Sequence, residues 1–236
     1  MTPRLFRCAP AAVGLSLGLS RPGVALDYPI GLTNCGVKSW IDAPPARAVT
    51  MNQGTTEVML ALGLEDRMAG TAYLDDYIWP ELADAYNSVP VLNDKYPTLE
   101  EIQEANPDFL YASYGSAFRD SRFNFTDMLK EEECALVTVV RDKNETHCRQ
   151  ELNDHGIHTY LQKPYCELTE HRPEDGATIA ALYAEIWDIA TIFDAYDAGR
   201  KLVDSIEGHF REAKRVAEAG AAAGVPPIRV LWLDGW

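Results

Sequence analysis

Between residues 47 and 161, short apolar runs alternate with stretches whose apolar positions recur at helical spacing. The predicted strands are Arg47–Met51, Met68–Ala72, Val89–Leu92, Asp108–Ser113 and Ile157–Leu161. The predicted helices between them are Glu57–Leu62, Ile78–Tyr86, Thr98–Glu104 and Gln150–His155. Thr55 or Thr56 is expected to cap the first helix, and Thr98 the third. This alternation predicts an α/β fold with a short, mostly parallel sheet.

A long helical repeat follows from Thr178. Apolar residues recur every three or four positions as far as Ala213, which predicts one or two long amphipathic helices. Gly220–Pro227 is a linker rich in small residues and proline, and Ile228–Leu233 is a predicted strand. Because a lone strand cannot bury its faces or pair its edges, we expect a second lobe to begin here and to be cut short, rather than a strand that joins the first sheet.

The first residues have the pattern of a secretory signal. Arg4 and Arg7 precede a short apolar stretch, Ala11–Leu19, and small residues precede a possible cleavage after Ala25. An N-terminal tail of no defined role is the alternative. Residues 26–46 are expected to form an irregular lead-in. No other stretch is apolar for long enough to span a bilayer, so the chain is not expected to be embedded in a membrane.

Charge narrows the range of partners. The formal net charge is −15 at pH 7. Such a surface repels the phosphates of nucleic acids and the headgroups of anionic lipids, so neither is an expected partner.

The cysteines are consistent with an oxidising compartment. Of five cysteines, Cys8 would leave with the signal. Cys35, Cys134, Cys148 and Cys166 allow three pairings, and no pair has the C-x-x-C spacing of a zinc or redox site. We expect structural disulfides. Residues 114–147 also contain two N-x-[ST] sequons, at Asn124 and Asn144, and an apolar stretch that is either a strand or part of an insertion.

No motif for catalysis stands out. The sequence contains no G-x-S-x-G, H-E-x-x-H or P-loop pattern. Asp75 and Asp76 are adjacent, a spacing that usually points two carboxylates apart. Gly156 separates His155 from His158, which disfavours a shared helical face. No resident metal or cofactor is therefore expected, and a metal-dependent enzyme is the least favoured alternative.

Four ordered segments resemble the Fe/cobalamin periplasmic-binding family, whose members serve ABC importers of ferric siderophores, haem or vitamin B12. The segments are Pro45–Glu57, Ala61–Gly70, Pro97–Leu110 and Ile186–Phe193. The resemblance implies a Rossmann-like first lobe, a long rigid interlobe helix over Tyr196–Ala219, and the first strand of a second lobe. The boundaries it implies are 1–25 for the signal peptide, 26–46 for the lead-in, 47–173 for the first lobe, 174–220 for the helical connector and 228–236 for the start of the second lobe.

The resemblance also implies a binding site. In open α/β sheets, ligands lie beyond the carboxyl ends of the strands. Tyrosines at such ends suit bulky, partly apolar chelates. The residues expected to bind ligand are Asn52, Gln53, Thr55, Tyr73, Asp75, Tyr96, Ser113, Tyr114 and Tyr165, with Leu74, Ser116 and Pro164 beside them. Ordinary half-buried core positions are the alternative for Tyr73 and Tyr114.

Further roles follow from the family pattern. Glu100 matches the acidic residue by which the first lobe docks on a membrane permease, although a glutamate favoured by the helix dipole is an equal explanation. Cys35 and Cys166 match family positions, which implies a Cys35–Cys166 disulfide and leaves Cys134 to pair with Cys148.

The expected function is capture of a small chelated metal in the periplasm or outside the cell, for delivery to an ABC permease. A secreted receptor of the same fold without a transport role is the alternative. With half of the cleft missing, the chain alone is expected to bind ligand weakly or not at all.

Overall fold

The computed structural model describes residues 27–118, 149–150, 152–162, 166 and 178–226. Within them, five parallel strands form one sheet in the order β5-β4-β3-β6-β7. The strands are β3 (Ala48–Met51), β4 (Met68–Ala72), β5 (Val91–Asn93), β6 (Phe109–Ala112) and β7 (His158–Leu161). All five predicted strands are confirmed, with small shifts at their ends. The α/β fold with a parallel sheet is confirmed as well.

The sheet is covered on both faces. Successive residues of β3 point to opposite sides, so Ala48 packs into one hydrophobic cluster and Val49 and Met51 into the other. The first cluster includes apolar residues of α1 (Gln53–Ala61), α6 (Ile179–Ile192) and α7 (Tyr196–Ala222). The second includes α3 (Leu99–Ala105) and the short helix Gly115–Phe118. Because both faces are buried, strands such as β3 and β6 are buried at every position.

The other helices lie in the connections. Short 3₁₀ turns occupy Glu65–Arg67 and Pro80–Leu82, and α2 (Ala83–Ser88) follows the second of these. Residues 149–150 and 152–154 are helical, as predicted. Thr98 caps α3 by a full capping box, in which its side chain accepts from the Glu101 amide and the Glu101 carboxylate accepts from the Thr98 amide.

The first helix starts earlier than predicted. It begins at Gln53, not Glu57, and neither Thr55 nor Thr56 caps it. Both threonines lie inside the first turn, and their hydroxyls donate back to backbone carbonyls, Thr55 to Met51 and Asn52 and Thr56 to Asn52. A threonine hydroxyl can form its hydrogen bond either as the capping residue or inside the first turn of a helix. The sequence alone therefore does not distinguish a capping threonine from one in the first turn.

The lead-in is not irregular, as was predicted. It contains an antiparallel hairpin of β1 (Ile30–Asn34) and β2 (Val37–Ile41), joined by a turn at Cys35 and Gly36, both with positive φ. Asn34 side-chain atoms make two hydrogen bonds to the backbone of Leu161 in β7, of 2.8 and 2.9 Å. The amide of Gln150 makes an equivalent pair with the backbone of Lys38 in β2. The hairpin is thereby fixed beside the edge strand of the sheet.

A disulfide also fixes the hairpin. Cys35 is bonded to Cys166, with 5.3 Å between their Cα atoms, as the family pattern implied. The predicted Cys134–Cys148 pair, both sequons, the stretch Leu136–Val140, the signal segment and the strand Ile228–Leu233 lie outside the described residues.

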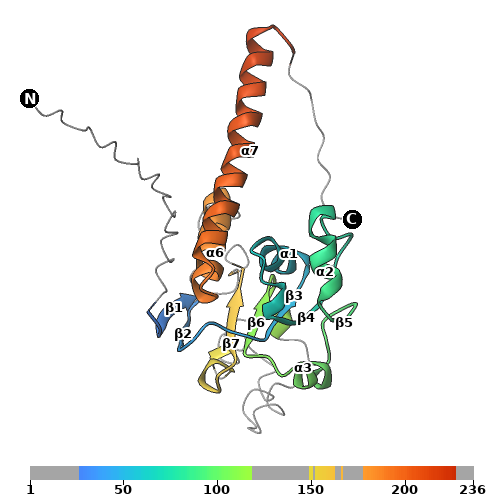
Figure 1. Cartoon of the computed structure of the whole chain (residues 1–236), viewed down its shortest axis with the longest axis vertical. Helices are drawn as coiled ribbons and strands as arrows, with labels where there is room; N and C mark the ends of the chain where they lie inside the picture. The colour runs from blue at the N-terminus through green and yellow to red at the C-terminus, as the bar shows by residue number, and fades with distance from the viewer. Residues whose placement is uncertain (1–26, 119–148, 151, 163–165, 167–177, 227–236) are drawn as a thin grey trace, which may run out of the picture.

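Two helices make up the C-terminal part. They are separated at Asp194, which has a φ of 52°. At Gly199 they approach closely, because a Cβ placed there would lie 2.6 Å from the Cβ of Ala190. Helix α7 covers the predicted Tyr196–Ala219 and extends to Ala222. Figure 1 shows α7 running far beyond the sheet, and residues 209–219 are exposed throughout.

Helix α7 is the longest of the described helices and carries ion pairs along its exposed surface, such as Arg211–Glu207 and Arg215–Glu212. Among the described helices, none combines the length and the apolar character that crossing a bilayer requires.

Candidate ligand-binding site

Parallel strands bring the residues that follow them to one edge of the sheet. Asn52 follows β3, Tyr73 follows β4, Ser113 follows β6 and Gln162 follows β7. Since β4, β3, β6 and β7 are neighbours in that order, these four residues form a continuous row. This edge is where ligands bind in open α/β sheets.

Asn52 is the centre of the row. It is only 2% exposed, and its φ of 87° and ψ of 153° fall in a region that residues with a Cβ seldom adopt. The Asn52 side-chain oxygen accepts from the Ser113 amide at 3.3 Å and from the Tyr96 hydroxyl at 3.4 Å. Asn52 therefore links β3, β6 and the segment before α3.

Two tyrosines from different loops meet beside it. The rings of Tyr73 and Tyr96 are 4.7 Å apart between centroids and tilted by 44°. The Tyr96 hydroxyl also bonds to the hydroxyl of Ser116 at 3.0 Å. Tyr96 is buried and supports the ring of Tyr73, which is half-buried and therefore partly accessible to a ligand.

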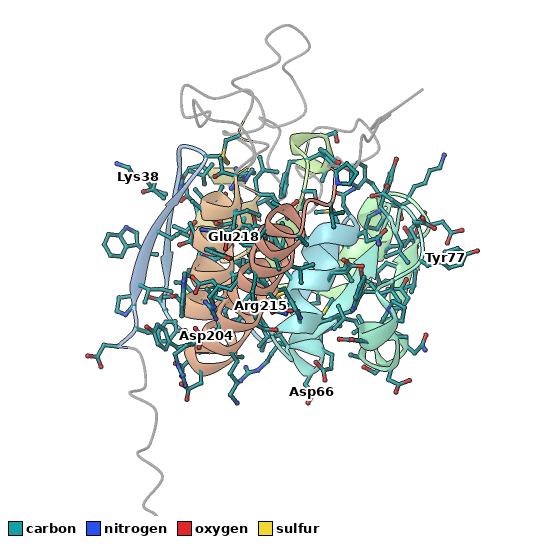
Figure 2. The ribbon with its side chains drawn as sticks, turned by 90° about the horizontal axis from the view of Figure 1, so that it is seen from above. Lys38, Asp66, Tyr77, Asp204, Arg215 and Glu218 are labelled. Carbon is teal, nitrogen blue, oxygen red and sulfur yellow. A yellow bond between two sulfur atoms is a disulfide. The ribbon has the colours of Figure 1, made fainter. Side chains whose placement is uncertain are left out.

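Gln53 organises the loop after β4. Its side chain donates to the Glu57 carboxylate and to the carbonyl of Tyr77, and accepts from the amide of Asp76. Glu57 in turn accepts from the amide of Trp79. The loop so held presents two aromatic side chains, Tyr77 at 91% exposed and Trp79 at 58%. Figure 2 shows Tyr77 pointing outward, at the opposite end of the molecule from Lys38.

The remaining predicted residues differ in access. Asp75 and Ser116 are exposed, Leu74 is half-buried and Tyr114 is 41% exposed. Thr55 is fully buried, and its hydroxyl is used by the backbone of β3 and Asn52, so it supports the edge from beneath. Pro164 and Tyr165 lie outside the described residues.

A ring of three threonine hydroxyls fixes the base of the site. Thr50, Thr56 and Thr71 are mutually hydrogen bonded at 2.7–2.9 Å and are buried. They join β3, β4 and α1, which sets the position of the first turn of α1 relative to the strand ends.

Sequence reasoning missed Gln162 and Glu185. Gln162 donates to the Glu185 carboxylate at 2.7 Å, and the Tyr111 hydroxyl donates to the same carboxylate oxygen. Three residues along α6, Asp188 accepts from the Tyr160 hydroxyl at 2.7 Å. Gln162 directly follows a predicted strand, a signal that could have found it. Glu185 lies mid-helix, with no local signal.

Burial sets the protonation of these tyrosines. Burial first, and then the carboxylate of Glu185, raises the pKa of Tyr111 well above its ordinary value. Burial and the carboxylate of Asp188 do the same to the pKa of Tyr160. Both phenols therefore stay neutral near pH 7, and both act as donors that attach α6 to the sheet.

Two acidic residues lie at the start of α3. Glu100 is exposed at the start of α3, where it is accessible to a partner. Its neighbour Glu101 is the capping residue, and the hydrogen bond from the Thr98 amide, ahead of other contributions, lowers its pKa. Among the described residues, no three histidine, cysteine or acidic side chains are grouped as metal ligands would be.

Residues 49–226 match the family described as periplasmic binding protein. The chain belongs to this family. The match confirms the resemblance indicated by the four motif segments. It begins within β3 and includes the other four strands of the sheet, both C-terminal helices and the four residues of the strand-end row.

Solved structures share the fold of this periplasmic binding protein. A periplasmic binding protein from Veillonella parvula is 24% identical, with a TM-score of 0.53 over 75% of this chain and 49% of that one. An ABC-type Fe3+-hydroxamate transport system from Saccharomonospora viridis is 21% identical, with a TM-score of 0.53 over 81% and 58%. Staphylococcus aureus SirA complexed with staphyloferrin B is 14% identical, with a TM-score of 0.53 over 84% and 53%.

The chain therefore spans about half the length of these solved structures. Among curated proteins, none is similar enough in sequence to count as a match.

Proposed function

We propose that this periplasmic binding protein captures a small metal chelate, of the ferric siderophore, haem or cobalamin kind, at the carboxyl edge of its sheet. The chelate is then passed to an ABC-type permease. Membership of the family supports solute binding. One structure of the same fold belongs to an Fe3+-hydroxamate transport system, and another is a complex with staphyloferrin B. Both support a chelated metal as the cargo.

The observation that carries the proposal is the contact between Asn52, Tyr96 and Ser113, with Tyr73 packed on Tyr96. Side chains from three separate loops are joined before any ligand arrives. Such preorganisation lowers the ordering cost of binding. The accessible rings of Tyr73 and Tyr114 then provide apolar contact area beside hydroxyl and amide groups, a combination common in small-molecule sites.

Glu100 is the proposed contact to the permease. It is exposed at the first turn of α3, whereas Glu101 beside it is used by the capping box. A carboxylate that makes no capping contact can pair with an arginine of a partner at little cost. Secretion to the periplasm or the cell exterior, with removal of residues 1–25, completes the proposal.

Binding is tested by equilibrium dialysis of the chain against a ferric hydroxamate, a ferric catecholate, ferric citrate, haem and cobalamin. We expect one class to be retained, with weak affinity for the chain alone. Tyr73→Ala should weaken binding about tenfold, because it removes an aromatic stacking contact that contributes roughly 1–1.5 kcal/mol.

Phe210→Ala serves as the matched control, since Phe210 is an exposed aromatic on α7. It should bind as the unaltered chain does. The proposal is wrong if none of the five chelates is retained at millimolar concentration, or if Tyr73→Ala and Tyr114→Ala both bind like the control.

A further inference from the structure

Helix α1 begins at the centre of the strand-end row with its N-terminus uncapped. Its nine residues follow Asn52, which makes no capping hydrogen bond because its side chain is turned toward Ser113 and Tyr96. In the described part of the chain, the first-turn amides of Gln53, Gly54 and Thr55 have no acceptor. Unpaired amides and the helix dipole together favour a negative charge at such a point.

Ser113 provides a second, independent indication of a ligand here. It is 4% exposed, and its hydroxyl makes no hydrogen bond with any described residue. That hydroxyl points at the helix start, since a Cβ on Gly54 would lie 3.7 Å from the Ser113 Oγ. Ser113 Oγ is not among the fully buried side-chain atoms of the described residues that lack a partner, so this hydroxyl is reachable from outside and can donate to a bound oxygen atom.

Gln162 closes the other side. Its amide nitrogen and oxygen lie 3.6 and 3.5 Å from the same Cβ position on Gly54. One amide hydrogen is donated to Glu185, which Tyr111 also contacts, and this holds the Gln162 side chain in place. The Gln162 side chain is also hydrogen bonded to the Tyr111 hydroxyl, so it forms a fixed polar wall of the space beside Gly54.

We propose that Gly54, Ser113 and Gln162 form a subsite for a negatively charged oxygen of the chelate, such as a free carboxylate. The inference rests on the proposed function and adds the ligand class: anionic, carboxylate-bearing chelates are favoured over neutral ones. The donors are the amides at the start of α1 and the Ser113 hydroxyl after β6. Gln162 after β7 forms the opposite wall, and Gly54 leaves the space between them open. Hydrogen bonds from fixed donors to a charged acceptor are the strong kind.

The net charge of −15 does not prevent this. Charges more than about 8 Å away are largely screened at physiological salt, whereas the amide donors act in direct contact. The carboxylate of Glu185, which is bonded to Gln162, accepts hydrogen bonds from two donors, Tyr111 and Gln162. Selectivity for an anion therefore depends on local donors rather than on the overall field.

Gly54→Ala is the decisive variant. Gly54 does not have a positive φ, and an added Cβ would make only ordinary contacts of 3.5–3.7 Å, so the fold should be kept. The methyl group would, however, occupy the space between Ser113 and Gln162. Gly208→Ala is the matched control, because Gly208 is a helical glycine on α7 whose Cβ would meet only Arg211.

The probes are gallium(III) citrate, which is anionic and carries carboxylates, and gallium(III) tris-acetohydroxamate, which is neutral. Both are followed by amide nuclear magnetic resonance on the full chain. We expect citrate chelate to shift the amides of Gln53, Gly54 and Ser113. We also expect Gly54→Ala to weaken its binding about tenfold, with Gly208→Ala unchanged. Metal-free citrate should shift the same amides more weakly if the chelate is the preferred source of the carboxylate.

Each other result has a definite meaning. If both chelates shift Asn52 and Tyr96 equally, and Gly54→Ala binds citrate chelate as well as the unaltered chain does, the anion subsite is refuted while the proposed function stands. If neither chelate moves any amide at the strand ends, both proposals are refuted. A stronger shift by metal-free citrate than by its chelate would also refute the preference for a chelate.

Discussion

Replacing Asn52 with glycine and, separately, with alanine distinguishes backbone strain from side-chain hydrogen bonding at the centre of the site. Both variants lose the side-chain oxygen that accepts from Ser113 and Tyr96. The Ser113 amide keeps its hydrogen bond to the Met51 carbonyl, at 3.3 Å, so the loss of the Asn52 acceptor should cost only about 0.5–1.5 kcal/mol in either case. The two variants differ only in how the backbone tolerates a φ of 87° with a ψ of 153°.

Alanine keeps the strain of this conformation, which costs about 1–3 kcal/mol, whereas glycine removes it. Glycine in turn loses about 0.5–1 kcal/mol through its greater freedom in the unfolded chain. The net expectation is that Asn52→Gly is more stable than Asn52→Ala, by up to about 2.5 kcal/mol. That order is the reverse of the one found in helices, where alanine is the more stabilising residue.

Urea unfolding followed by circular dichroism measures both free energies of unfolding. Gly208 supplies the internal reference, because Gly208→Ala on exposed α7 should raise stability by up to about 1 kcal/mol. If Asn52→Ala proves as stable as Asn52→Gly or more so, Asn52 is not strained, and the account of its conformation is wrong.

Three other properties follow from the same structure. Reducing the Cys35–Cys166 bond, which spans 131 residues, should lower the free energy of unfolding by about 2–5 kcal/mol, and peptide mapping without reduction should find no other partner for Cys35. Burial raises the pKa of Tyr111 and Tyr160, so the stability that these phenols contribute is complete below about pH 10 and is lost as the pH rises further. Urea unfolding at about pH 8 and about pH 10.5 should therefore show a smaller drop in the free energy of unfolding for Tyr160→Phe than for the unaltered chain. Thr98→Ala should cost about 1 kcal/mol in urea unfolding and Thr98→Ser almost nothing, and equal losses would contradict the capping role.

Local patterns were sufficient for the elements whose causes are local. Thr98 and Glu101 have the spacing of a capping box, and the helix after them begins where that spacing requires. The buried strands β3 and β6 were recognisable because both of their faces are covered, which leaves continuous apolar runs.

The hairpin β1–β2 was missed because its inward positions include Asn34 and Ser39, which disguise the alternation of a strand. Their partners, Leu161 and Asn153, lie more than a hundred residues away in sequence, so no local reading could show that these polar groups are satisfied.

The candidate site was predicted in part. Its position followed from the parallel sheet, and Asn52, Tyr73, Tyr96 and Ser113 do meet there. The role of Thr55 as a buried support depended on where α1 begins. The link from Gln162 to Glu185 depends on how α6 packs, a tertiary contact with no signature in either segment.

The side-chain amides beside β7 and β2 have a consequence for self-association. An unpaired edge of a sheet is a template on which another chain can add a strand. At Leu161 and at Lys38, a carboxamide occupies both backbone positions that an incoming strand would use. Asn34 and Gln150 thus act as single-residue substitutes for a neighbouring strand. Replacing either residue with alanine should leave these backbone groups unpaired and increase aggregation of the folded protein.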